Sequence, residues 1–153
     1  MAMAVEIERK FLVTGEFPRT GEVEMVQGYL CKDLDRTVRV RLEGDRAVLT
    51  IKGQTVGISR PEFEYEIPPE DARELLGMAV GPLVEKTRYY HATGAHTWEI
   101  DVFKGENTGL VVAEIELSSE NEAFEKPAWL GVEVSEDRRY SNSALSVTPY
   151  TNW

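Results

Sequence analysis

Residues 5–13 read Val-Glu-Ile-Glu-Arg-Lys-Phe-Leu-Val, and this stretch decides the fold. Charged and apolar side chains alternate along it, and residues two positions apart lie on the same face of a β-strand. Glu6, Glu8 and Lys10 therefore share one face, while most of the apolar residues share the other. The stretch predicts a strand with one ionic face and one apolar face.

The same two-residue period recurs seven more times along the chain. Turn signals separate several of the repeats, among them Glu43-Gly44-Asp45 and Thr93-Gly94-Ala95. Short connections of this kind join antiparallel neighbours, so the sequence predicts an antiparallel meander of eight strands. The expected strands are 5–13, 24–32, 37–43, 47–52, 60–67, 84–91, 97–104 and 110–117.

Helix signals are few and short. Residues 70–78 follow a Pro-Pro pair, carry one apolar stripe and predict a helix. Ser119 and Glu122 fit a capping box, which predicts a second short helix. Two more short helices are expected at 135–140 and 141–147. Helices this sparse suit elements that only cover the apolar side of a sheet.

On each predicted strand the charged side chains gather on one face. One face of an antiparallel sheet is often exposed to solvent, and these charged side chains could simply form such a solvated face. A sheet of about eight strands also tends to curl or close into a barrel, whose interior can hold side chains or one small ligand. If the helices cover the apolar faces, the ionic faces lie together on the other side. We therefore expect a mainly β (α+β) fold in which the ionic faces line a closed barrel.

Length and composition set the remaining limits. At 153 residues, without a Pro/Gly/Ser-rich divide, residues 1–153 are expected to form a single domain. Lys and Arg number 17 against 27 Asp and Glu, and the net charge of -10 disfavours binding to nucleic acid or an anionic membrane. No apolar run approaches a membrane span. The single cysteine, Cys31, can form no internal disulfide, and a cytoplasmic location is expected.

A cavity that gathers both carboxylates and cationic side chains needs compensation, because buried like charges are costly. Mg²⁺ prefers carboxylate oxygens together with waters and phosphate oxygens. Arg and Lys bind the remaining phosphate charge, Arg through a planar fork and Lys as a point charge. The mixture of side chains therefore favours a polyphosphate with divalent metals over a sugar, a peptide or an apolar ligand.

The stretch Glu6-Ile7-Glu8-Arg9-Lys10 resembles the ExExK signature of the CYTH superfamily, the triphosphate tunnel metalloenzymes. That signature alone is a weak signal, but the resemblance continues in order along nearly the whole chain. The other matching segments are 27–30 (QGYL), 38–41 (VRVR), 49–52 (LTIK), 60–64 (RPEFE), 85–89 (EKTRY), 100–103 (IDVF), 113–117 (AEIEL) and 139–142 (RYSN). The chain resembles the compact bacterial members of this superfamily, which are inorganic triphosphatase-like.

The resemblance implies an eight-stranded antiparallel β-barrel tunnel, one or two divalent metals and a linear triphosphate bound along the axis. The segment after Trp129 resembles the C-terminal plug helix that closes one tunnel mouth. The implied metal ligands are Glu6, Glu8, Glu62, Glu64, Glu114 and Glu116. The implied substrate contacts are Lys10, Arg39, Arg41, Lys52, Arg60, Lys86 and Arg88. The implied catalytic residues are Glu8, Lys10, Glu64 and Asp101, the last orienting basic groups or water.

Several of these residues keep a second interpretation. Lys10 and Asp101 could form only a structural ion pair, and Glu62 could be solvated near a strand end. Arg60 could flank a loop instead of lining the tunnel mouth, and Tyr29 is expected to pack. The residues expected at the surface are Glu99, His91 and His96.

The expected activity is hydrolysis of a phosphoanhydride bond in inorganic tripolyphosphate or a triphosphate ester by metal-activated water, with Mg²⁺ or Mn²⁺ as cofactor. A thiamine triphosphatase or a class IV-type adenylyl cyclase of the same fold is one alternative, although the sequence shows no dedicated aromatic or Asn/Gln set for a purine. A non-catalytic polyphosphate- or nucleotide-binding module is another, and the intact carboxylate pairs on the first and last strands disfavour it. Proteins of this kind can form homodimers, but the sequence identifies no interface.

Overall fold

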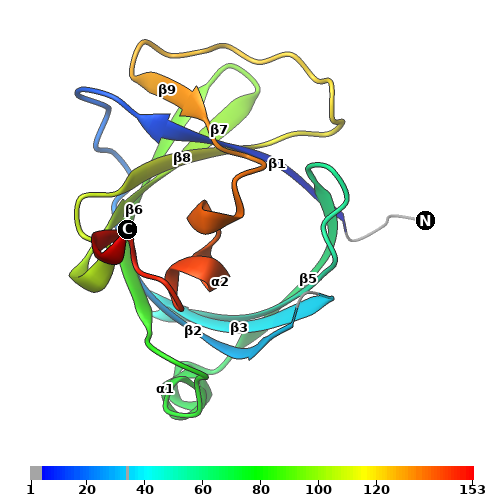
Figure 1. The fold of residues 1–153 in the computed structure, drawn as a ribbon, viewed down its shortest axis with the longest axis vertical. Helices are drawn as coiled ribbons and strands as arrows, with labels where there is room; N and C mark the ends of the chain where they lie inside the picture. The colour runs from blue at the N-terminus through cyan, green and yellow to red at the C-terminus, as the bar shows by residue number, and fades with distance from the viewer. Residues whose placement is uncertain (1–4, 34) are drawn as a thin grey trace.

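Eight strands close into a barrel in the computed structural model, which describes residues 5–33 and 35–153 (Figure 1). The strands are β1 Val5–Val13, β2 Val23–Lys32, β3 Arg36–Glu43, β4 Arg46–Gly53, β5 Ser59–Ile67, β6 Val84–Thr93, β7 His96–Phe103, β8 Val111–Glu116 and β9 Leu130–Glu133. Around the ring they run in the order β5-β4-β3-β2-β6-β7-β8-β1, and pairing of β1 with β5 closes it. The ninth strand, β9, pairs with the end of β1 that β5 leaves free.

The eight predicted strands are confirmed, each within two residues of its expected ends, and so is the closed antiparallel barrel. The predicted meander is only partly right. Strands β2 to β5 and β6 to β8 follow chain order, but β2 pairs with β6, and β1 lies between β8 and β5. Local alternation shows which residues share a face and carries no information on which distant strands meet.

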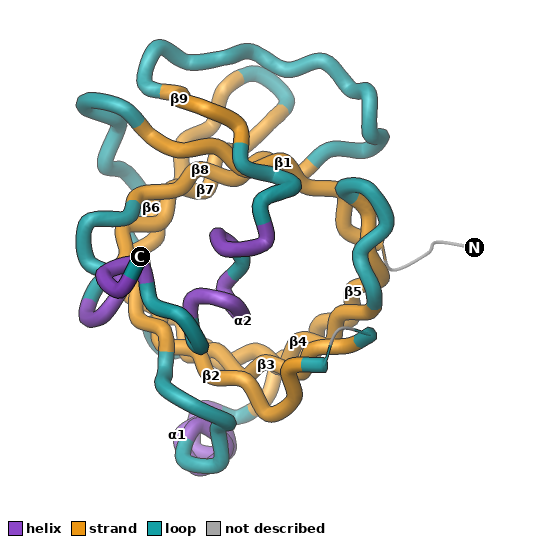
Figure 2. The backbone as a smooth tube through the Cα atoms, in the orientation of Figure 1, coloured by secondary structure: helices purple, strands orange, loops and turns teal. Residues whose placement is uncertain are grey.

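The helices are fewer and shorter than expected. The predicted helix at 70–78 is confirmed as α1 (Pro69–Leu76), which packs outside the barrel through Ala72 (Figure 2). The helix predicted from Ser119 and Glu122 is wrong, because residues 117–129 form a long loop. Glu122 accepts a hydrogen bond from the Ser118 backbone N–H and pairs with His96, so a tertiary contact replaces the capping box.

The chain after β9 turns back into the ring (Figures 1 and 2). Instead of a helix at 135–140 it forms a single 3₁₀ turn, Arg138–Tyr140, and the helix expected at 141–147 is shortened to α2, Asn142–Leu145. The Ser141 hydroxyl caps α2 by accepting from the Ala144 N–H at 3.2 Å. This confirms the C-terminal plug, and we call residues 134–145 the plug segment. Two further 3₁₀ turns are Gly105–Asn107 and Tyr150–Asn152.

The main apolar core lies outside the barrel wall. Phe11, Trp98 and Trp129 pack edge to face beneath the 117–129 loop, with ring centroids 5.8 Å apart for Phe11 and Trp98 and 5.5 Å for the two tryptophans. Each such buried side chain contributes about 1.5–3 kcal/mol. The expectation that helices cover the apolar faces therefore holds only at α1, and the loop and β9 cover β1, β7 and β8.

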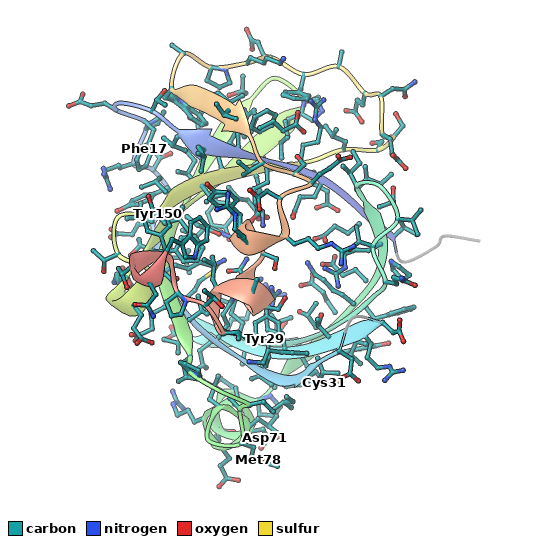
Figure 3. The ribbon with its side chains drawn as sticks, viewed as in Figure 1. Phe17, Tyr29, Cys31, Asp71, Met78 and Tyr150 are labelled. Carbon is teal, nitrogen blue, oxygen red and sulfur yellow. The ribbon has the colours of Figure 1, made fainter. Side chains whose placement is uncertain are left out.

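Because the wall buries its apolar side chains outward, the side chains that point into the ring are mostly polar (Figure 3). An exception lies at the plug, where Leu145 packs on Val84, Phe103 and Val112 and anchors α2 against the strands. No helix in the described part of the chain has the length and apolarity needed to cross a membrane.

Candidate active site

The barrel encloses a cavity of about 440 Å³ lined mostly by charged side chains. Every strand of the ring contributes to it, as does the plug segment. The carboxylates in the lining of the barrel wall are Glu6, Glu8, Glu62, Glu64, Glu99, Glu114 and Glu116. The cationic side chains in that wall are Lys10, Arg39, Arg41, Lys52, Arg60 and Arg88. The alternation seen first in residues 5–13 therefore points its ionic face inward.

Strand register brings the two ends of the chain together at this cavity. Glu8 pairs with Glu116 and Lys10 with Glu114 across β1 and β8, and Glu6 lies opposite Arg60 of β5. Side chains directly opposite each other on one face of an antiparallel pair are close neighbours. The register thus gathers carboxylates from β1 and β8 on one wall.

These carboxyl groups interact in pairs. Burial and the charges of Glu114 and Glu6 raise the pKa of Glu8 well above its usual value. Burial opposes ionisation of Glu114 as well, but Lys10 and a hydrogen bond with Glu8 hold the pKa of Glu114 well below its usual value. Burial and Glu6 likewise raise the pKa of Glu62 to about 7. One carboxyl of each pair therefore tends to keep a proton, since two adjacent charges are unfavourable.

Such a donor set fits a hard divalent cation, which prefers carboxylate oxygens and would replace the shared protons. Glu6, Glu8, Glu114 and Glu116 supply these oxygens on one wall, and Glu62 and Glu64 lie on β5 beside them. Within residues 5–33 and 35–153, no group of three acidic, His or Cys side chains is already arranged to hold a metal. The chemistry of the site suits a metal, and to hold one Glu6 and Glu114 would turn from their present partners, Lys52 and Lys10.

Lys52 is one of those partners. Its Nζ lies 2.9 Å from Glu6 Oε1 and 3.4 Å from Glu62 Oε2. Although burial opposes it, the charges of Glu6 and Glu8 raise the pKa of Lys52. The ammonium thus stays charged and links the acidic wall to the basic one.

The opposite side of the cavity, which we call the basic wall, carries the guanidinium groups of Arg39, Arg41 and Arg88. Two of these groups have a donor without a partner among the described residues. Arg39 and Arg41 are both buried, and Nε of each lacks a hydrogen-bond partner within the described residues. Arg41 Nε lies 3.2 Å from Glu43 but without hydrogen-bond geometry. Burial, with Arg39 and Arg88 nearby, lowers the pKa of Arg41. Buried unpaired donors are costly, and an anion in the cavity would offset the positive charge of this wall.

A fully buried charge cluster lies beside the basic wall, on the inward faces of β6 and β7 where the plug segment meets them. The Asp101 carboxylate accepts from Lys86 Nζ at 2.7 Å and from Arg88 at 2.7 and 3.0 Å. Despite its burial, Arg88 and Lys86 lower the pKa of Asp101 to about 2. Burial lowers the pKa of Lys86 to about 8, although Asp101 opposes this. The cluster fixes the orientation of Arg88, whose guanidinium also lies 3.3 Å from Glu99 in the cavity.

The structure brings together most of the predicted site residues, but two of them lie inside the ring beneath the plug segment. Lys86 and Asp101 are fully buried and do not line the cavity. Lys10 pairs with Glu114 at 3.7 Å and does not pair with Asp101. Arg60 lines the cavity and also donates to the Gly53 carbonyl.

Some expectations about neighbouring residues are wrong. Glu99 lines the cavity instead of the surface, because its strand face points inward with Asp101. His91 and His96 are half-buried against Trp129 and Glu122, since the 117–129 loop covers them. Tyr29 is buried as expected but also borders the cavity.

Sequence reasoning missed most of the plug-segment lining. The cavity residues from this segment are Val134, Ser135, Glu136, Asp137, Arg138, Ser141, Asn142 and Ser143. Asn142 belongs to the segment 139–142 that resembled the CYTH superfamily, and this was the only signal available.

The family assignment follows from comparison with known proteins. Residues 4–150 match the model of the CYTH domain. The chain belongs to the CYTH family. An inorganic triphosphatase of Acetivibrio thermocellus is 48% identical over 154 residues, covering 99% of both chains. An inorganic triphosphatase of Nitrosomonas europaea is 41% identical, covering 94% of this CYTH chain and 97% of the relative.

Solved structures agree with the fold. The crystal structure of the inorganic triphosphatase NE1496 matches this CYTH domain with a TM-score of 0.67 and 37% identity, over 93% of this chain and 94% of that one. The PH1012 protein from Pyrococcus horikoshii OT3 matches with a TM-score of 0.59 at 24% identity, over 76% and 80% of the two chains. At that identity the second match supports the fold alone.

Proposed function

We propose that this CYTH protein is a Mg²⁺-dependent inorganic triphosphatase that hydrolyses tripolyphosphate to orthophosphate and pyrophosphate. The observation that carries the proposal is the pair of facing walls: buried guanidinium donors without partners on one side, and buried carboxyl pairs on the other. A short linear polyanion accompanied by a cation supplies both walls with what they lack. The two relatives named inorganic triphosphatase support the same reaction.

In this proposal the basic residues bind the phosphate chain. Arg39, Arg41 and Arg88 donate to phosphate oxygens, and Lys52 and Arg60 add positive charge at the side nearest Glu6. Charge-assisted bonds from guanidinium to phosphate are among the strongest in proteins. Lys86 extends this set only if its ammonium, which now donates to Asp101, turns toward the cavity.

The proposed catalytic groups hold the reacting end of the chain. Lys10 is fixed by its Nζ donating to the Tyr140 carbonyl at 3.1 Å, and it points along the wall that carries Glu8 and Glu114. Glu64 accepts from Thr50, which in turn accepts from Arg39. Asp101 acts as a positioning residue, because its hydrogen bonds within the described residues go to Lys86 and Arg88.

Water attacks the terminal phosphorus, the bond to the bridging oxygen breaks, and pyrophosphate leaves. The cationic wall stabilises the charge spread over the phosphoryl oxygens in such a reaction. A divalent cation held by Glu6, Glu8, Glu114 and Glu116, with Glu62 and Glu64 assisting, would polarise the phosphoryl group and lower the pKa of water. Arg39, Arg41 and Arg88 are buried, and the lower dielectric around buried groups strengthens their contacts with an anion.

The test is release of orthophosphate from tripolyphosphate with Mg²⁺, with Mn²⁺, and with chelator alone. Glu8→Gln removes one buried carboxylate while keeping its shape, and we expect it to lower kcat at least a hundredfold without changing the melting temperature. Glu16→Gln, an exposed residue near the end of β1, is the matched control. Full activity of the Glu8 variant, or unchanged activity of the wild type in chelator, would contradict the proposal.

The same assay separates the rival activities. Tyr29 is the only aromatic side chain in the cavity lining among the described residues, so the cavity offers little to hold an adenine. Incubation with ATP and detection of cyclic AMP tests the cyclase, and thiamine triphosphate tests the thiamine triphosphatase. Binding of tripolyphosphate without any product would favour the non-catalytic module.

A further inference from the structure

Asn142, the first residue of α2, occupies a defined place where the plug segment meets the barrel wall. Its side-chain Oδ1 accepts two hydrogen bonds, from Gln27 Nε2 at 3.0 Å and from Lys86 Nζ at 3.1 Å. Both donors are fully buried, and Asn142 itself lines the cavity. The amide therefore connects the buried Lys86–Asp101–Arg88 cluster to the space where a substrate binds.

The orientation of this amide is fixed by chemistry. A Lys ammonium has donors and no acceptor, so it must face the oxygen of the Asn142 amide and not the nitrogen. The nitrogen, Nδ2, then faces away from Lys86 and Gln27. None of the hydrogen bonds found in the described part of the chain uses Asn142 Nδ2. Two N–H donors are thus free on a residue that borders the cavity.

Gln27 is a second buried donor that holds the Asn142 amide in this orientation. Its side chain is fully buried, and its Oε1 has no hydrogen-bond partner among the described residues. A buried polar atom without a partner is costly, and native proteins keep few of them. Gln27 Nε2 donates to Asn142, so the one described side-chain contact of this residue serves to position the Asn142 amide.

The plug segment has other anchors besides this network. Leu145, three residues further along α2, is fully buried against Val84, Phe103 and Val112 and provides an apolar anchor. The Ser141 hydroxyl caps the helix independently. A polar network at Asn142 adds an oriented donor that an apolar contact could not supply.

We propose that Asn142 is a substrate-binding residue whose Nδ2 donates to a phosphate oxygen of the bound triphosphate, with Gln27 and Lys86 as positioning residues. The proposal deepens and rests on the proposed function. The ionised oxygens of a triphosphate accept hydrogen bonds, so a neutral amide nitrogen recognises them without adding charge to a wall already rich in cations. The plug segment then takes part in recognition in addition to closing the tunnel.

The decisive variant is Asn142→Asp, which keeps the shape and keeps an oxygen toward Gln27 and Lys86 but replaces the free donor with a second oxygen. Affinity is measured by calorimetric titration of the nonhydrolysable analogue imidotriphosphate with Mg²⁺. A hydrogen bond to a charged group corresponds to a loss of about ten- to a hundredfold in affinity, and we expect a loss of that size with an unchanged melting temperature. Asn152→Asp, at an exposed site outside the cavity, is the matched control and should bind like the wild type.

A double-mutant cycle separates direct contact from an effect through Lys86. Asn142→Ala should weaken analogue binding in the wild type and also in a Lys86→Met background, because the lost donor belongs to Asn142 itself. Disappearance of the effect in that background, or wild-type affinity of Asn142→Asp, would overturn the inference. A wild-type chain that binds the analogue but does not hydrolyse tripolyphosphate would refute only the proposed function, and one that does not bind it at all would refute both.

Discussion

Neutralising Asp101 should destabilise the fold in a pH-dependent way. Its carboxylate is fully buried and is the shared counter-charge of Lys86 and Arg88. In an Asp101→Asn variant the two cations remain buried, and the carboxylates that still act on them are Glu99, 3.3 Å from Arg88, and Glu114. The variant keeps the size of the side chain, so the change tests charge and not packing.

The size of the effect follows from the pKa. Arg88 and Lys86 lower the pKa of Asp101 from 3.8 to about 2 against the effect of burial. Since one pKa unit corresponds to about 1.4 kcal/mol, this lowering is worth about 2.5 kcal/mol near neutral pH. Removing one partner of a buried ion pair typically costs about 3–5 kcal/mol. We therefore expect Asp101→Asn to lower the free energy of unfolding by about 2–4 kcal/mol.

The pH dependence has a definite sign. The folded-state pKa lies below the ordinary value, so the stabilisation is fully present above pH 4 to 5 and is lost as the pH falls from about 4 to about 2. Lys86 stays charged over that range, because its pKa is about 8. The gap between wild type and variant should be constant from about pH 5 to 7 and shrink below about pH 4.

Urea unfolding at several pH values measures this gap by linear extrapolation. Asp45→Asn, in the exposed β3–β4 turn, is the matched control and should change stability by less than about 0.5 kcal/mol. A gap below about 1 kcal/mol near pH 7, or a gap that stays the same near pH 2, would refute the assignment of Asp101 as the ionised centre of the cluster.

Two further predictions test the basic wall and the packing of the barrel. Arg41→Met should raise the KM for tripolyphosphate by about ten- to a hundredfold, because charge-assisted hydrogen bonds are lost. Steady-state kinetics measures the change, with Arg73→Met on the outer helix as the control. An unchanged KM would show that Arg41 does not bind the substrate. Gly28→Ala should lower stability by about 1–3 kcal/mol, because the added Cβ would lie 2.8 Å from Leu83 Cδ2 and 2.9 Å from Ala79 Cβ. A melting temperature equal to the wild type would contradict this account of the close approach.

Much of the barrel could be read from the chain because strand alternation is a local property. The alternation within β1 is enough to assign its residues to two faces, and the same holds for Arg39 and Arg41 on β3. The pairing of like faces was therefore predictable, and with it most of the charged lining. Residues on the inward faces, such as Glu8 and Glu114, lie close together as expected, because closure of the barrel directs all inward side chains into one cavity.

The segment after β8 was predicted poorly because distant contacts override its local signals. Glu122 has the spacing of a capping residue, yet it pairs with His96 instead. Phe124 packs against Phe11 and Trp98, which holds residues 117–129 as a covering loop. Strand β9 forms by pairing with β1, and its four residues are too few to carry a pattern that predicts such a distant partner.

The sequence by itself determined the strands and the division of each into an ionic and an apolar face, since both follow from the spacing of residues along one strand. Only the tertiary structure decided which distant strands meet, above all the pairing of β1 with β5 across more than fifty residues of chain, which closes the barrel. It also decided that Lys86 and Asp101 are fully buried beneath the plug segment while Asn142 lies at the cavity. Depth along a strand and the path of the plug segment depend on which distant side chains pack together, and a linear pattern does not encode that.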